Sequence, residues 1–356
     1  LVTMRGGRYV VPLKAEHRAK MPGIVHDQSA SGATIFVEPQ VIVDLNNELR
    51  ELELAERAEI DRILAELSSN VAEHFHELMN NQKLLIALDV MFAKGKLSCQ
   101  MQAEAPQMNT DGVLDLKQAK HPLLDRKKAV PINVAVGRDY RTLVITGPNT
   151  GGKTVTLKTI GLLALMAQSG LHIPAASTSL MPIFRNIFAD IGDEQSIEQS
   201  LSTFSSHMRN TVELVEKTRK DTLVLLDELG AGTDPTEGAA LAIAILERLS
   251  SQGAMTVATT HYNELKKYAL STPGVENASM EFNVETLSPT YRLFIGVPGK
   301  SNAFEISRKL GLPEGIIDRA GQLLERGDIA FEDVLSAIEK DKQKAEAERD
   351  EAAAIS

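Results

Sequence analysis

Hydrophobic positions follow two different patterns along this chain, and the change between them divides it. From residue 41 to about residue 100, apolar residues recur every three to four positions, as Leu45, Leu49 and Leu52 do, and charges of both signs fill the rest. This period is typical of amphipathic helices, and the segment holds one glycine and no proline. We therefore predict two long helices, with a break or kink near Asn80 and Asn81, that form either a rigid arm over 40–104 or part of a helical core.

After Pro106 the pattern changes to short apolar runs separated by helical stretches. The runs cover residues 142–146, 223–227 and 254–259, and each is short enough to be a buried strand. Strands that alternate with helices predict a mostly parallel sheet covered by helices on both faces. We expect this α/β domain to extend over residues 105–325.

The two ends of the chain differ from both patterns. Residues 1–39 are rich in glycine and β-branched residues, and Arg8 to Leu13 and Ala33 to Val37 resemble strands. This segment is too short to be an independent domain, so we expect the end of one that begins earlier. Residues 339–351 include six acidic and four basic side chains. We expect 326–356 to be an exposed charged helix, a coiled-coil stump or a linker.

Composition limits the partners of the chain. Its 356 residues are 43% hydrophobic and 24% charged, as in ordinary soluble proteins, and no apolar run approaches a membrane span, so no membrane partner is expected. The single cysteine, Cys99, fits a cytoplasmic location. A net charge of −10 excludes a general electrostatic grip on nucleic acid, so any such contact needs a local basic patch. Two candidate patches, each equally readable as solvated surface, are Arg5, Arg8, Lys14, Arg18 and Lys20, and Lys117, Lys120, Arg126, Lys127 and Lys128.

A phosphate-binding loop directly follows the first apolar run. It consists of Gly147, Pro148, Asn149, Thr150, Gly151, Gly152, Lys153 and Thr154, and an apolar helix is expected after it, from Val155 to Ala167. The glycines let successive backbone N–H groups surround phosphates, and the helix N-terminus adds its positive end. We expect Lys153 to reach the β- and γ-phosphates of a nucleotide and the Thr154 hydroxyl to bind Mg²⁺.

Further chemistry follows the next two apolar runs. Asp227 and Glu228 end one run, where Asp227 would hold Mg²⁺ and Glu228 would orient and deprotonate the attacking water. The alternative is that this pair caps the next helix. His261 follows the other run and could sense the γ-phosphate, although strand-end histidines are often structural. Ser202, with its neighbours Ser205 and Ser206, would by chemistry alone mark the start of a helix.

Together these motifs resemble the MutS family of ATPases, over roughly residues 40 to 325. The likeness includes the uncommon Pro148-Asn149 pair, and the motifs occur in the family's order and spacing. They are Gly147 to Thr154, Ser202-Thr203-Phe204, Asp227-Glu228, Gly232-Thr233, Thr260-His261, and Gly296 to Ser301 followed by Gly311-Leu312-Pro313 and Arg319-Ala320. Within the family the chain is most similar to the bacterial second paralogues that carry an Smr nuclease domain, through its start, Asp190 to Ser196 and Gly230 to Gly238.

The resemblance implies an ABC-superfamily-like ATPase domain that uses ATP and Mg²⁺ in a homodimer with composite sites. Ser202 of one subunit would complete the ATP site of the other, and a helical dimerisation element would close the domain. The long helices would be a lever arm that couples nucleotide state to a clamped partner, and residues 1–39 a remnant of the core and clamp region. Proteins of this type are linked to branched DNA, suppression of homologous recombination and collided ribosomes. Endonuclease activity would come mainly from the Smr domain.

The chain also departs from the family in ways that leave alternatives open. We expect the 356 residues to include neither the family's mismatch-reading domain nor its Smr domain. Phe75-His76-Glu77 resembles the Phe-x-Glu motif that reads mismatches, but it lies in a charged helical segment, so we interpret it as a coincidence. Another ABC-type ATPase, such as a transporter motor or a chromosome-structure ATPase, would carry Leu-Ser-Gly-Gly where this chain has Leu201 to Phe204. A scaffold that binds nucleotide without hydrolysis is disfavoured by Glu228 and His261. The sequence does not discriminate between DNA and the ribosome.

Overall fold

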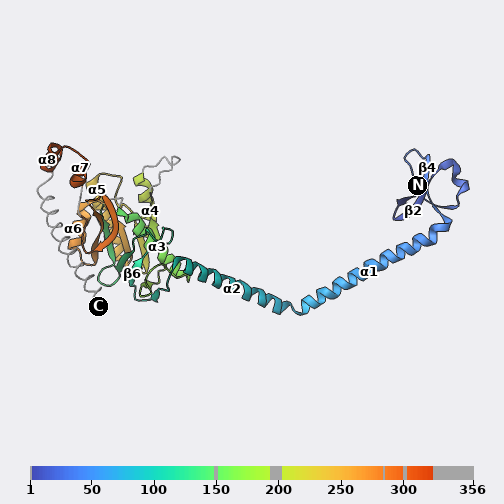
Figure 1. Ribbon diagram of the computed structural model, residues 1–356, viewed down its shortest axis with the longest axis horizontal. Helices are drawn as coiled ribbons and strands as arrows, with labels where there is room; N and C mark the ends of the chain where they lie inside the picture. The colour runs from blue at the N-terminus through green and yellow to red at the C-terminus, as the bar shows by residue number, and fades with distance from the viewer. Residues whose placement is uncertain (1, 148–150, 193–202, 284, 300–302, 324–356) are drawn as a thin grey trace. The chain divides into compact units, whose positions relative to one another are not determined.

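The computed structural model describes residues 2–147, 151–192, 203–283, 285–299 and 303–323, and it divides into two compact units, Leu1–Val90 and Met91–Ser356 (Figure 1). Each unit is described separately below. Among the described residues, no helix combines the length and the apolar character that crossing a membrane requires.

The first unit begins with a small antiparallel sheet in the order β1-β2-β4-β3. Strand β2 includes the predicted strand from Arg8 to Leu13, and β4 covers the predicted strand from Ala33 to Val37 except for its first residue. The bounds are Thr3–Arg5 for β1, Arg8–Lys14 for β2, Gly23–Gln28 for β3 and Thr34–Pro39 for β4, with short 3₁₀ helices at Ala15–Lys20 and Gln40–Ile42. The sheet has little apolar core, because within it only Val10, Ile35 and Val37 are buried hydrophobic residues.

A buried carboxylate joins this sheet to the helix that follows. Glu38 is fully buried, and its oxygens accept hydrogen bonds from Arg8 at 2.9 Å and from the amide of Asn46 at 2.7 Å. His26 Nε2 lies 2.6 Å from the same carboxylate. Burial raises the pKa of Glu38, but these hydrogen bonds and the Arg8 charge outweigh it and lower that pKa to about 2. The network therefore fastens α1 to the sheet where the apolar core is too small to do so alone.

The predicted helix pair is present, but its break lies elsewhere. Helix α1 covers Val43–Glu73 and helix α2 covers Phe75–Met101, so the break falls at His74 and the prediction of Asn80 and Asn81 is wrong. The His74 N–H donates to the carbonyl of Val71 at 3.2 Å, which tightens the turn. The two asparagines lie exposed within α2, because an asparagine costs a helix less than about 1 kcal/mol, which is too little to break a long helix.

The second unit is built on a six-stranded sheet in the order β10-β11-β12-β8-β13-β14. All neighbours are parallel except β13 and β14, which form an antiparallel hairpin. The three predicted runs correspond to β8, β11 and β12 within one residue at each end. The bounds are Thr142–Thr146 for β8, Asn186–Asp190 for β10, Thr222–Leu226 for β11, Met255–Thr259 for β12, Val275–Asn283 for β13 and Ser288–Ile295 for β14.

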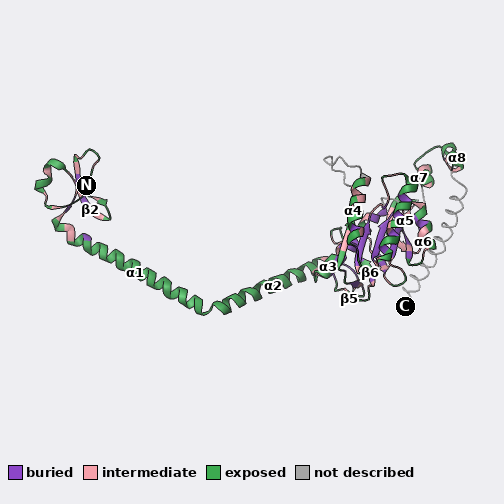
Figure 2. Ribbon diagram, turned by 180° about the vertical axis from the view of Figure 1, so that it is seen from behind, coloured by how far each residue is buried: buried purple, intermediate pink, exposed green. Residues whose placement is uncertain are grey.

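Side chains of the central strands are buried on both faces of this sheet, as the continuous apolar runs require. Leu143 and Ile145 pack with α3, whereas Val144 packs with α5 and α6. Figure 2 shows the buried strands between exposed helix surfaces. The helices are α3 at Lys153–Gln168, α4 at Thr203–Lys217, α5 at Pro235–Ser251, α6 at Asn263–Ser271, α7 at Ala303–Lys309 and α8 at Glu314–Leu323.

A second sheet, which the sequence patterns did not predict, helps to cover the α3 face. Its order is β5-β9-β6-β7, and Leu114, Leu116, Val134 and Val136 join α3 in one hydrophobic core. Its strands are β5 at Gln107–Asn109, β6 at Leu114–Ala119, β7 at Ile132–Val136 and β9 at Leu180–Pro182. The expectation of helices on both faces is therefore correct only in part, since one face is shared between a helix and a sheet.

Candidate active site

The predicted chemical groups meet at one edge of the six-stranded sheet. Strands β11, β12 and β8 are adjacent and parallel, so their carboxyl ends lie side by side. Gly147 follows β8, Asp227 and Glu228 follow β11, and His261 comes two residues after β12. This edge is where α/β sheets bind their ligands.

Lys153 is the first residue of α3, and its amine is enclosed at this edge. The Nζ atom donates to the carbonyl of Gly147 at 2.6 Å and lies 3.2 Å from Nε2 of His261. The residue is only 1% exposed. Burial, with a smaller effect from the Lys266 charge, lowers the pKa of Lys153 to about 8, although Glu228 and Asp227 act in the opposite direction. A buried amine at the first position of a helix is suited to neutralise an anionic ligand.

Thr259, at the end of β12, fixes the two acidic residues. Its Oγ1 donates to Oδ1 of Asp227 at 2.5 Å and accepts from the N–H of Glu228 at 2.8 Å. The Glu228 backbone has a φ of 49°, a left-handed conformation that is costly for a residue with a side chain. The structure therefore holds the Asp227 carboxylate and the Glu228 backbone in defined positions, the latter at the expense of local strain.

These carboxylates do not cap the next helix. Helix α5 is capped by Asp234, whose carboxylate accepts from the N–H groups of Thr236 and Glu237. The alternative that Asp227 and Glu228 cap the next helix is therefore wrong, because Asp234 is the N-cap of α5. Asp227 and Glu228 remain directed at the sheet edge.

His261 lies between the lysine and the glutamate. Its Nε2 is 3.6 Å from Oε1 of Glu228, and both side chains are partly exposed. Burial and the positive charge of Lys153 lower the pKa of His261, against the opposing effect of Glu228. The ring is therefore neutral near pH 7, and one of its nitrogens can accept a hydrogen bond while the other donates.

Two glycines of the loop have backbone conformations that a side chain would strain. Gly147 has a φ of 123° and Gly152, the N-cap of α3, has a φ of 98°. A Cβ atom on Gly152 would also lie 3.1 Å from the ring of Tyr291. Gly299 packs against the start of the loop and donates to Thr146 Oγ1 at 2.6 Å. Gly299 therefore supports the start of the loop from outside it.

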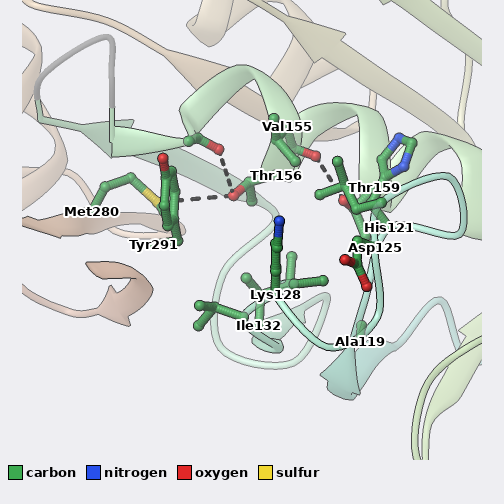
Figure 3. A pocket seen from close by; sticks show the side chains of 14 residues that line it. Ala119, His121, Asp125, Lys128, Ile132, Val155, Thr156, Thr159, Met280 and Tyr291 are labelled. Atoms are coloured by element: carbon green, nitrogen blue, oxygen red, sulfur yellow. Dashed lines mark hydrogen bonds between the residues drawn. The ribbon is translucent and has the colours of Figure 1, made fainter. Parts of the chain in front are cut away.

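A pocket of about 360 Å³ opens beside the loop (Figure 3). Its walls are mostly apolar, and the hydroxyls of Thr156 and Thr159 donate to the carbonyls of Gly152 and Val155, one turn earlier. Tyr291 borders the pocket with a φ of 60°, an uncommon conformation for an aromatic residue. The lining residues are Ala119, His121, Leu124, Asp125, Lys128, Ala129, Val130, Ile132, Gly152, Val155, Thr156, Thr159, Met280 and Tyr291.

The sequence patterns did not identify this pocket as part of the site. Its lining comes from three separate regions, residues 119–132, α3 and the β13–β14 hairpin, so no local motif marks it. The sequence held one signal for the pocket, because the second candidate basic patch overlaps residues 119–132 and includes Lys128.

Four residues that the sequence assigned to nucleotide binding lie outside the described residues. They are Pro148, Asn149, Thr150 and Ser202. Gly151 and Thr154 are described, the latter as the second residue of α3.

Comparison with known proteins agrees with these motifs. The family profile of MutS domain V matches residues 143–327, just over half of the chain. The chain is 61% identical to "Endonuclease MutS2" of Alkaliphilus metalliredigens over 355 residues, which is all of this chain and 45% of that protein. The same name belongs to relatives in Clostridioides difficile, 61% identical over 99% of this chain, and Acetivibrio thermocellus, 57% identical over 98% of it.

The chain spans less than half the length of these relatives: 45% of the first and 44% of each of the other two. MutS domain V is an α/β domain of the P-loop ATPase type, and the six-stranded sheet with its loop and carboxylates has that architecture. The chain therefore belongs to the MutS family.

Proposed function

We propose that the chain binds ATP with Mg²⁺ at the edge formed by β11, β12 and β8, and that it hydrolyses the γ-phosphate. The observation that carries this proposal is the convergence of three groups from three elements. The Lys153 amine, the neutral His261 ring and the Glu228 carboxylate follow one another at 3.2 Å and 3.6 Å. In this proposal the amine neutralises the charge of the phosphates, the ring senses the γ-phosphate by a hydrogen bond, and the carboxylate is the general base for the attacking water.

The residues present fit a magnesium ion. Thr154 and Asp227 would hold it, and when bound it supplies positive charge that stabilises the phosphate oxygens. Asp227 already has one oxygen fixed by Thr259. Lys153 would exchange its hydrogen bond to Gly147 for phosphate oxygens, and Glu228 would orient the attacking water and accept its proton.

We propose that the pocket beside the loop takes the adenine base. A volume of about 360 Å³ falls within the range of small-molecule sites. Its apolar walls suit a flat aromatic ring, and the satisfied hydroxyls of Thr156 and Thr159 need no partner from the ligand. Tyr291 would contact the base with its ring, which accounts for an aromatic side chain in a strained backbone conformation.

We further propose that the chain acts as a homodimer with composite ATP sites. Ser202 immediately precedes helix α4, so that helix would present it to the second subunit. Helices α1 and α2, with 31 and 27 residues, would be the lever arm. The end of α2 is fixed on the ATPase unit, where Lys94 donates to the Ser169 carbonyl at 3.0 Å. The partner clamped in response to ATP would be branched DNA, with an effect on homologous recombination, or the ribosome.

Nucleotide binding and phosphate release by the purified chain test the enzymatic proposal. Lys153→Ala should abolish binding, Glu228→Gln should bind ATP and lose turnover, and Tyr291→Ala should weaken binding of adenine nucleotides. Lys220→Ala is the matched control, because this exposed lysine lies before β11, at the opposite end of the strand from Asp227. Equal binding by Lys153→Ala and the wild-type chain would refute the proposed site.

A further inference from the structure

A carboxylate at the same sheet edge, outside the proposed ATP chemistry, connects two elements. Asp190 is the last residue of β10, and its side chain is 10% exposed. Its Oδ2 lies 2.8 Å from Nδ1 of His207, and its Oδ1 accepts from Nδ2 of Asn210 at 3.1 Å. Because an ionised carboxylate only accepts hydrogen bonds, His207 Nδ1 carries the proton. Both oxygens of Asp190 are thus bonded to helix α4.

The main chain of Asp190 leads to the proposed magnesium ligand. Its carbonyl accepts from the N–H of Asp227 at 2.8 Å, and β10 pairs in parallel with β11 so that Asp190 lies opposite Leu226. One residue therefore bonds Asp227 through its main chain and α4 through its side chain. A continuous path of hydrogen bonds therefore runs from Asp227 through Asp190 to the first two turns of α4.

Two further contacts connect α4 with the catalytic edge. A cavity of about 20 Å³ is lined by Asp190 and His207 together with Asp227 and Glu228. That volume is enough for one water molecule. Phe204 in the first turn of α4 lies so close to Gly232 that a Cβ there would be 3.2 Å from the Cβ of Phe204. Gly232 follows the carboxylates in the same turn.

We propose that Asp190, His207 and Asn210 form a positioning tether that couples the state of Asp227 and Glu228 to helix α4. This inference rests on the proposed ATPase function and assigns it three further residues that do not touch the nucleotide. Changes at Asp227 when nucleotide binds are carried by Asp190 to the first two turns of α4. In return, the tether holds the Asp227 backbone in the geometry that hydrolysis requires.

A pair of near-isosteric substitutions at His207 tests the tether. His207→Asn places an amide N–H where Nδ1 was, whereas His207→Leu has a similar shape and no donor. We expect His207→Leu to lower kcat about tenfold, as for loss of a hydrogen bond to a charged group, with the KM for ATP changed less than about twofold. His207→Asn should stay within about threefold of wild type in kcat. Arg209→Leu is the control for placing a leucine on α4, because Arg209 is exposed and lies two residues after His207, and its kcat should equal that of the wild-type chain.

A second measurement reports the coupling itself. Hydrogen exchange of the α4 amides, residues 203–217, should change on addition of ATP–Mg²⁺ in the wild-type chain and in His207→Asn, but not in His207→Leu. Asn210→Leu, at an exposed position, should reduce the response without unfolding the helix.

Equal kcat for the Leu and Asn variants, or a loss of affinity as large as the loss of rate, would overturn the tether. Failure of the proposed function is distinguishable, because the wild-type chain would then neither bind nor hydrolyse ATP, and the inference would fall with it.

Discussion

The depressed pKa of Lys153 leads to a quantitative prediction about nucleotide affinity. Burial is the main cause that lowers this pKa to about 8 in the nucleotide-free structure. A bound triphosphate surrounds the amine with negative charge, which favours the protonated form and raises the pKa again. Binding therefore takes up a proton wherever the free amine is neutral. Below pH 8 the amine is protonated in both states, so affinity is independent of this group there.

Above pH 8 the affinity should fall by up to tenfold for each pH unit. At pH 9 about nine in ten free molecules carry a neutral amine, so the Kd should be about tenfold higher than at pH 7, or about 1.4 kcal/mol weaker. The assay is titration with a non-hydrolysable ATP analogue from pH 7 to 9.5. Calorimetry in two buffers of different ionisation enthalpy should show uptake of about 0.9 proton at pH 9.

The control for this prediction is Lys153→Arg, because a guanidinium stays protonated throughout the range. Its affinity, whatever its absolute value, should not depend on pH between 7 and 9.5. A wild-type Kd that stays constant over this range would refute the reasoning. An equal slope in the arginine variant would do so as well, since the proton would then be taken up elsewhere.

Three other substitutions test separate parts of the account. Gly152→Ala should weaken nucleotide binding and lower stability by about 1–2 kcal/mol, because its φ is left-handed, and an unchanged Kd and Tm would contradict this. Thr259→Val removes the hydroxyl bonded to Asp227 and should raise the Mg²⁺ concentration needed for half-maximal hydrolysis about tenfold, as a magnesium titration will show. Glu38→Gln should destabilise the small sheet by about 2 kcal/mol, measured by hydrogen exchange in β2 and β4. The folded pKa of Glu38 is about 2 against an ordinary 4.5, so its contribution is complete above pH 4.5 and is lost as the pH falls towards 2, and pH-independent exchange protection would refute this.

Features specified by contiguous residues could be predicted from the sequence. The strand before Gly147, the loop and helix α3 follow from one local pattern, and the apolar runs at β11 and β12 have no competing interpretation. Family membership followed from several such motifs in a fixed order. The structure then places Lys153, Asp227, Glu228 and His261 at one edge, because parallel neighbours bring the ends of separate strands together.

Features that depend on distant residues could not be predicted. The pocket beside the loop joins residues 119–132 with Tyr291, and the second sheet pairs β5 with β9, some 70 residues away. No period in the sequence marks either. The helix break was predicted at Asn80 and Asn81, which the helix tolerates, and no glycine or proline marks the actual break at His74. Asp190 and His207 both lie in or beside recognised motifs, but their hydrogen bond is visible only once β10 and α4 are placed.

The central claim is that ATP binding at this edge drives two chains together. Sedimentation of the chain and of Glu228→Ala, without nucleotide and with ATP–Mg²⁺, tests it most directly. The account predicts a monomer without nucleotide and a dimer with ATP, most fully in the variant because it retains unhydrolysed ATP. Monomers in both cases, with ATP shown to be bound, would contradict the composite site and the assignment of Ser202 to it.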